Sequence, residues 1–126
     1  MPYSYRIDRP LRLVISTACG RVAFAEILAH QDRLLSDSEF SPEFNQLVDG
    51  TEAIALDISG YEARTVASRQ IFSATSRRAF VSPGPAIPGV GLLMAAYQEA
   101  GLSSQVQVFY NMPSAYGWLQ HGTTSG

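Results

Sequence analysis

The sequence has no lysine, only one cysteine and no long run of apolar residues. Its cations are nine arginines scattered along the chain, with only Arg77 and Arg78 adjacent, and the formal net charge is −2. Nucleic-acid-binding proteins usually carry a basic stripe, so this distribution indicates no nucleic-acid partner. The lone Cys19 excludes an internal disulfide, and with the polar N-terminal sequence it predicts a cytoplasmic protein. No apolar stretch approaches the length of a transmembrane segment.

The chain has 126 residues, enough for a single domain (1–126) with one sizeable core. We expect the polar tail from about residue 121 to be disordered. The periodicity of apolar residues predicts strands at 3–8, 11–20, 45–49, 79–81 and 106–110, and helices at 22–36, 59–74, 87–100 and 111–120. This order predicts an α/β fold. An N-terminal antiparallel hairpin joins a mixed, largely parallel sheet of about five strands, covered by about four helices.

The stretch from Asn45 to Glu62 is the most informative part of the sequence. It reads as a buried strand, a short crossing segment over 51–56, and a helix that starts at Asp57-Ile58-Ser59-Gly60. Ser59 and Glu62 have the spacing of a capping box, in which each side chain binds the other residue's backbone N–H. In the closing helix, Trp118 is predicted to be buried against the sheet.

Short motifs across nearly the whole chain occur in the order and spacing of a known family. They are YRID, GRVAFAEI, FNQLVDG, LDISGYE, RRAFVSP and VQVFYNMPSAYGWL. Together they resemble STAS/SpoIIAA-like domains, in particular a bacterial branch labelled STAS/SEC14-like. The resemblance implies a SpoIIAA-like fold and a non-enzymatic interaction or regulatory module that acts through protein–protein contact.

The start of the second predicted helix both matches this family and departs from it. Its four residues resemble the D-S-S-G turn of STAS domains, in which the first serine accepts a regulatory phosphate. Ile58 stands at that position and has no hydroxyl to phosphorylate. Ser59 remains a candidate, although helix capping alone explains a serine there. We therefore expect contact without the phosphoserine switch, through Asp57, Ser59, Gly60, Tyr61, Arg64 and Ser68.

The third predicted helix lies in a stretch, Val81 to Tyr97, that contains no charged residue. A helix packed on a sheet normally has a polar outer face, but here Ile87, Pro88, Leu92 and Ala95 would face outward. Either the helix is buried in its own domain, or a second copy, a partner protein or a small apolar ligand covers it. The SEC14-like resemblance implies the last of these, a lipid-type ligand-binding protein. Ile87, Leu92 and Met94 are the candidate contact residues for a partner or a ligand, and the flexible Met94 would form an adaptable wall.

Catalytic chemistry has little support in the sequence. His30 has no second ligand nearby and is predicted to be a boundary residue, and His121 lies in the tail. Cys19 is predicted to be a small buried residue at a strand end. Asp49 and Asp57 could form an acidic pair, but turn and cap roles explain both. Without a Ser-His-Asp spacing or a phosphate-binding loop, we expect no catalytic residue, no metal and no cofactor, so an enzyme ranks third.

Overall fold

The structure, a computed structural model of the chain, describes residues 2–84 and 87–121. The tail that we expect to be disordered lies outside them from residue 122 onward. Within the described ranges, no helix combines the length and the apolar character needed to cross a membrane.

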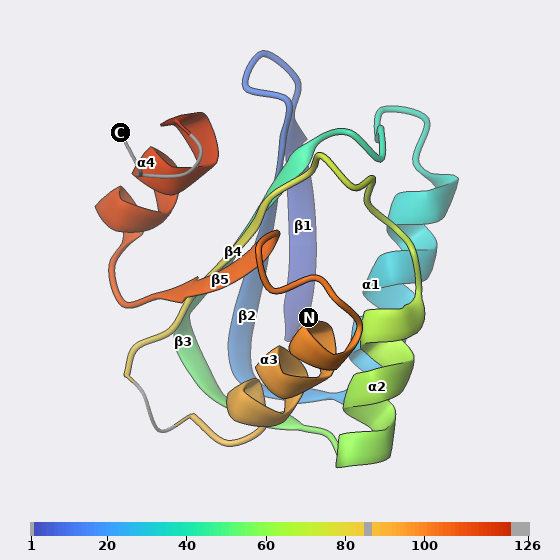
Figure 1. Ribbon diagram of the computed structural model, residues 1–126, viewed down its shortest axis with the longest axis vertical. Helices are drawn as coiled ribbons and strands as arrows, with labels where there is room; N and C mark the ends of the chain where they lie inside the picture. The colour runs from blue at the N-terminus through green and yellow to red at the C-terminus, as the bar shows by residue number, and fades with distance from the viewer. Residues whose placement is uncertain (1, 85–86, 122–126) are drawn as a thin grey trace.

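Five strands and four helices make up the described part of the chain (Figure 1). In order they are β1 (Tyr3–Asp8), β2 (Leu13–Ala23), α1 (Phe24–Ser36), β3 (Asn45–Asp57), α2 (Gly60–Ser68), β4 (Arg78–Val81), α3 (Val90–Glu99), β5 (Val106–Phe109) and α4 (Met112–His121). The strands form one sheet in the order β1-β2-β3-β4-β5. β1 and β2 pair antiparallel, and the remaining pairs are parallel. The predicted α/β fold, with its hairpin and mixed sheet, is confirmed.

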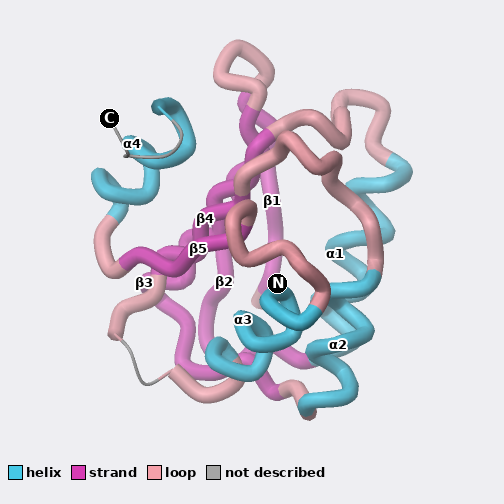
Figure 2. The backbone as a smooth tube through the Cα atoms, in the orientation of Figure 1, coloured by secondary structure: helices cyan, strands magenta, loops and turns pink. Residues whose placement is uncertain are grey.

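Three helices cover one face of the sheet and one helix covers the other, as the ribbon and the backbone tube show (Figures 1 and 2). The parallel strands follow one another in a single direction across the sheet. Right-handed crossovers then place α1, α2 and α3 on the same face. α4 follows the last strand and packs on the opposite face, against side chains from β2, β3 and β4.

The alternation of side chains along β4 shows how the two faces are built. Ala79 and Val81 belong to the cluster under α4, whereas Phe80 packs against the cluster under α2 and α3. Arg78 shares the face of Phe80, because residues two apart in a strand point the same way. It is buried there although it is charged. Trp118 of α4 is also buried, which confirms the prediction for the closing helix.

β3 is longer than the sequence predicted. We expected a strand over 45–49 and a crossing segment over 51–56, but β3 continues to Asp57. Its second half pairs with the extended end of β2, which runs to Ala23 rather than stopping at Gly20. β4 has only four residues and pairs with the first half of β3. The second half of β3 was mistaken for a connection because only one neighbouring strand supports it.

A short segment before α3 closes the side of β3 that β4 leaves free. The backbone N–H of Leu56 donates a hydrogen bond to the carbonyl oxygen of Pro88 at 2.8 Å. A Cβ atom on Gly89 would lie 2.1 Å from the Leu56 carbonyl oxygen. Gly89 also has a φ of 88°, in the left-handed region that favours glycine. The close approach therefore depends on glycine at this position.

α2 is shorter than predicted. The apolar spacing indicated a buried helical face continuing to Ala74, but the helix ends at Ser68 and Ala74 is exposed. The next residue, Arg69, has an extended backbone, and its guanidinium donates hydrogen bonds to Gln31 and Asp32 of α1. Contact with a neighbouring helix thus replaces the further helical turn that the periodicity suggested.

Candidate functional site

The edge of the sheet where β3 leads into α2 holds most of the residues that the sequence singled out. In open α/β sheets, binding sites lie at this carboxyl edge of the parallel strands. Ser59 Oγ accepts a hydrogen bond from the backbone N–H of Glu62 at 3.1 Å. In return, the backbone N–H of Ser59 donates to Glu62 Oε1 at 2.9 Å. The predicted capping box is confirmed.

Replacing Ser59 with alanine should lower the free energy of unfolding by about 1 kcal/mol, because the Glu62 N–H loses its cap. Urea unfolding followed by circular dichroism measures the difference. Ser68→Ala is the matched control, since the Ser68 hydroxyl is exposed and bonds only to the Thr65 carbonyl. Equal stability of Ser59→Ala and the wild type would contradict a structural role for the cap.

Asp57 and Ile58, which precede the cap, are both engaged by the fold. Ile58 is half-buried and packs against the core cluster under α2 and α3. Asp57 forms an exposed ion pair with Arg21 of β2, with N–O distances of 2.7 and 3.0 Å. Eight residues of strand separate Asp57 from Asp49, roughly 25 Å at the usual rise per residue. The two aspartates therefore do not form an acidic pair.

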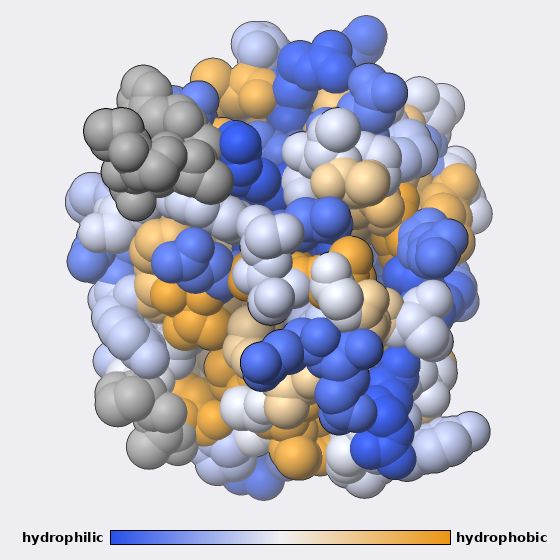
Figure 3. Space-filling view, viewed as in Figure 1, coloured by the Kyte–Doolittle hydropathy of each residue, from blue (hydrophilic) through white to orange (hydrophobic). Residues whose placement is uncertain are grey.

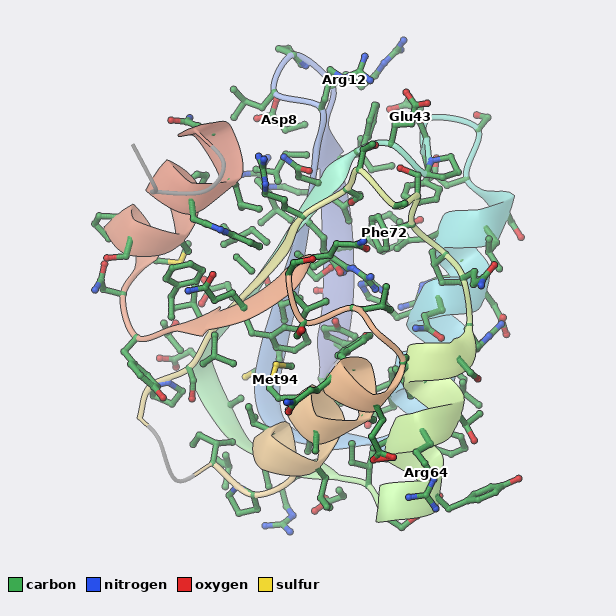
Figure 4. All side chains as sticks on the ribbon, viewed as in Figure 1. Asp8, Arg12, Glu43, Arg64, Phe72 and Met94 are labelled. Carbon is green, nitrogen blue, oxygen red and sulfur yellow. The ribbon has the colours of Figure 1, made fainter. Side chains whose placement is uncertain are left out.

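The outward face of α2 carries Tyr61, Arg64 and Ser68, which are all exposed. Tyr61 keeps 73% of its surface accessible, an unusual amount for a large aromatic side chain. A Cβ on Gly60 would lie 3.7 Å from Arg64 Nη1, so the guanidinium lies over the first turn of the helix (Figure 4). Arg64 has no ion-pair partner among the described residues. The helix start thus presents an aromatic ring beside a free cation.

The candidates on α3 and before it do not share one surface. Leu92 is on the outer side and is 47% exposed, and Figure 3 shows apolar surface beside and below α3. Ile87, which was predicted to face outward, is half-buried and lines an internal cavity. Met94 projects toward the sheet (Figure 4) and packs against the main core cluster rather than lining the cavity. The interpretation of Ile87 as outward-facing is therefore wrong.

The internal cavity lies between the sheet and helices α1, α2 and α3. Its volume is about 50 Å³. This is room for a few water molecules. Pockets for drug-sized ligands are larger, roughly 300–1,000 Å³. Most of the lining is apolar, but Tyr3, His30, Gln46 and Arg78 also reach the cavity.

His30 is the centre of a buried polar cluster that the sequence analysis missed. It is 1% exposed, so the prediction of a boundary residue is wrong. Its Nε2 lies 2.8 Å from Ser16 Oγ, and Gln46 Nε2 donates to the same hydroxyl at 2.9 Å. The ring stacks on Tyr3, with centroids 4.1 Å apart. Burial, together with the nearby Arg33 cation, lowers the pKa of His30 to about 4, so the ring is neutral at pH 7.

A signal for this cluster was present in the strands rather than near His30. Ser16 and Gln46 are polar residues that share their side of β2 and β3 with the buried Val14 and Val48, on the face that α1, α2 and α3 cover. Buried polar groups require partners, so each of them implied another polar side chain on that face. Because Ser16 and His30 are 14 positions apart in the sequence, no local pattern indicated that their side chains meet.

Other candidate chemical groups are dispersed. Cys19 is exposed, because it alternates with the buried Ala18 in β2, and the prediction of a buried cysteine is wrong. Among the described residues, no group of three histidine, cysteine or acidic side chains could hold a metal ion. The structure therefore offers two separate places of interest: the exposed start of α2 and the buried polar groups around the cavity.

Comparison with known proteins supports the fold. No protein-family model and no curated protein sequence matches the chain. Among solved structures, the chain is similar to an uncharacterized protein of the DUF3478 family from Shewanella loihica PV-4, which has a SpoIIAA-like fold. The two chains are 19% identical, the match covers 93% of each, and the TM-score is 0.58. The chain therefore has a SpoIIAA-like fold, as the resemblance implied.

Proposed function

We propose that this SpoIIAA-like domain is a non-enzymatic interaction module whose contact surface is formed by Ile54, Tyr61, Arg64 and Leu92. These residues come from the end of β3, the start of α2 and the first turn of α3. The main observation behind this proposal is that three large hydrophobic side chains, Ile54, Tyr61 and Leu92, are exposed at this end of the molecule. We name these four residues the carboxyl-edge surface.

The composition of the carboxyl-edge surface favours a protein partner. Tyrosine and arginine are enriched among residues that dominate protein–protein binding energy. Tyr61 is already solvent-exposed and has few rotatable bonds, so binding orders it at low entropic cost. Arg64 provides a cation without an internal partner. The partner that fits is a protein with an apolar patch beside an acidic side chain.

A phosphorylation switch at the helix start has less support. The residue in the phosphoacceptor position, Ile58, packs into the core and contributes to stability. The Ser59 hydroxyl is occupied by the cap. We therefore propose constitutive contact, in which binding depends on the concentration of the partner rather than on modification of this turn.

The alternative of a small apolar or lipid-type ligand has weaker support than a protein partner. The cavity under α3 has about 50 Å³, and several polar or charged side chains line it, among them His30, Gln46 and Arg78. A long acyl chain would require a much larger opening of the helical layer. The exposed apolar side chains instead lie outside the cavity, where a macromolecule reaches them.

The experiment that tests the proposal places a photo-crosslinking amino acid at Tyr61 in the organism's own cells. The crosslinked protein is identified by mass spectrometry, purified and titrated against the domain by calorimetry. Tyr61→Ala should weaken binding by roughly tenfold or more, because truncated interface aromatics commonly cost over 1 kcal/mol. Tyr110→Ala is the matched control, since Tyr110 is also well exposed, at 59% against 73% for Tyr61, but follows β5. Equal affinities of both variants and the wild type would refute the surface.

A second copy of the chain is the other occupant that the experiment distinguishes. Light scattering of the wild type gives the number of subunits in solution. A dimer that Leu92→Glu converts to a monomer would assign the α3 part of the surface to self-association, because like charges would face each other across a twofold axis. A monomeric wild type leaves the carboxyl-edge surface free for a different protein.

A further inference from the structure

Arg78 is the first residue of β4, and its side chain is buried on the face of the sheet that α1, α2 and α3 cover. Only 6% of the residue is exposed. The guanidinium carbon lies 5.2 Å from the ring centre of Phe72 and 5.1 Å from that of Tyr97. Two aromatic rings therefore hold the guanidinium in place, as cation–π contacts do in ligand-binding arginines.

The charge of Arg78 has no counterion within the described part of the chain. The ion pairs found there join Arg12 to Glu43, Arg21 to Asp57 and Arg69 to Asp32. Arg78 Nε is buried and has no hydrogen-bond partner among the described residues. Burial lowers the pKa of the guanidinium, and the Tyr97 side chain beside it only partly offsets this effect. A buried charge without a partner is costly, and an external anion would remove that cost.

A groove open to the surface has Arg78 in its lining. It has a volume of about 610 Å³ and lies between the loop that follows α2 and the end of α3. Hydroxyl and amide groups of Ser68, Ser73 and Gln105 line it, and Phe72 points inward from the loop at its base (Figure 4). Arg78 and Phe72 line both this groove and the internal cavity, so together they separate the two.

The charges of the groove are all of one sign. Arg69 and Arg78 belong to its lining, and no aspartate or glutamate does among the described residues. Arg69 already donates to Asp32 and Gln31, which leaves Arg78 as the cation with an unused donor, its Nε–H. The apolar part of the lining includes Ile71, Phe72 and Leu102. The groove thus combines a free planar donor with an apolar wall.

We propose that this groove binds a small organic anion, with a carboxylate or phosphate group on Arg78 and the body of the molecule against Phe72 and Leu102. The planar guanidinium presents parallel N–H donors that match two oxygens of such a group. The groove lies at the opposite end of α2 from Tyr61, so the proposal is independent of the carboxyl-edge surface. Loss of anion binding and loss of partner binding are therefore separate outcomes.

The test titrates the full-length protein with sodium phosphate, acetate and benzoate at constant ionic strength, with chloride as the reference anion. Melting temperature and the ¹⁵N-resolved signal of the Arg78 Nε–H group are followed. At least one oxyanion should raise the melting temperature and shift the Nε–H signal saturably. Comparing phosphate with the carboxylates distinguishes the two ligand classes. Tighter binding of benzoate than of acetate indicates that the ligand contacts the apolar wall. No saturable shift with any of the three overturns the proposal.

Arg78→Met removes the guanidinium and keeps a long side chain, and Arg77→Met is the control with the same change of net charge. Arg78→Met should weaken binding by roughly 10- to 150-fold, the usual range for hydrogen bonds to a charged group. Its melting temperature should equal or exceed that of the wild type, because an uncompensated buried charge is gone. Equal weakening by Arg77→Met would show general electrostatic attraction and overturn the site. If Arg78→Met does not fold, the titration of the wild-type Nε–H signal alone tests whether the groove binds an anion.

Discussion

Replacing Trp118 with alanine is expected to lower the free energy of unfolding by about 3–5 kcal/mol. Trp118 is buried in α4, and its ring centre lies 5.6 Å from that of Phe109 on β5. The rest of the cluster consists of side chains from β2, β3, β4 and α4, namely Leu13, Ile15, Leu47, Ala79, Val81, Ala115 and Leu119. α4 is the one described helix on its face, so no other element fills the space that the indole leaves.

Urea unfolding followed by far-ultraviolet circular dichroism measures this effect, because Trp118 is the only tryptophan and its fluorescence disappears with it. Tyr110→Ala is the control on the neighbouring exposed surface, with an expected change within about 0.5 kcal/mol. If both variants unfold at the same urea concentration, α4 does not stabilise the sheet in solution.

Acid should destabilise the domain through His30. The folded-state pKa of His30 is about 4, below the ordinary value of 6.5, because the ring is buried beside Arg33. Between these pH values the unfolded chain binds a proton that the folded chain does not. Stability is therefore fully present above pH 6.5 and is lost as the pH falls toward 4. The loss at pH 4 should be about 3 kcal/mol.

The His30 contribution can be separated from that of carboxylates such as Asp37, whose pKa is lowered by hydrogen bonds from the Glu39 backbone and from Tyr5. His30→Gln keeps a polar side chain but does not titrate, so its stability should change less between pH 6.5 and 4. Proton NMR of the His30 ring in the wild type gives the folded-state pKa directly. A value near 6.5 would contradict the burial argument.

Local patterns predicted the parts of the fold that depend on neighbours in sequence. The capping box of Ser59 and Glu62 and the burial of Trp118 follow from spacing within one helix. The mixed, largely parallel sheet follows from the alternation of strands and helices. These features need no knowledge of which segment lies beside which, and the structure confirms them.

Features that depend on contacts between distant segments were missed. The second half of β3 looked like a connection because its support comes from β2, more than thirty positions earlier. His30 looked like a boundary residue because Ser16 and Tyr3 contact it only in the folded protein. Arg78 directly precedes the predicted strand over 79–81, and nothing in the local pattern singled it out. Its lack of a counterion becomes visible only when its surroundings are known.

The hydrogen bond between Leu56 and Pro88 has a consequence for how the protein behaves at high concentration. The far half of β3 has β2 on one side only, and such an edge attracts strands from other molecules into intermolecular sheets. The Pro88-Gly89 segment takes that place, with Gly89 allowing the approach. Proline has no backbone N–H, so Pro88 cannot pass the pairing on to a further strand. The segment therefore protects the longest strand of the sheet from edge-to-edge pairing with other molecules.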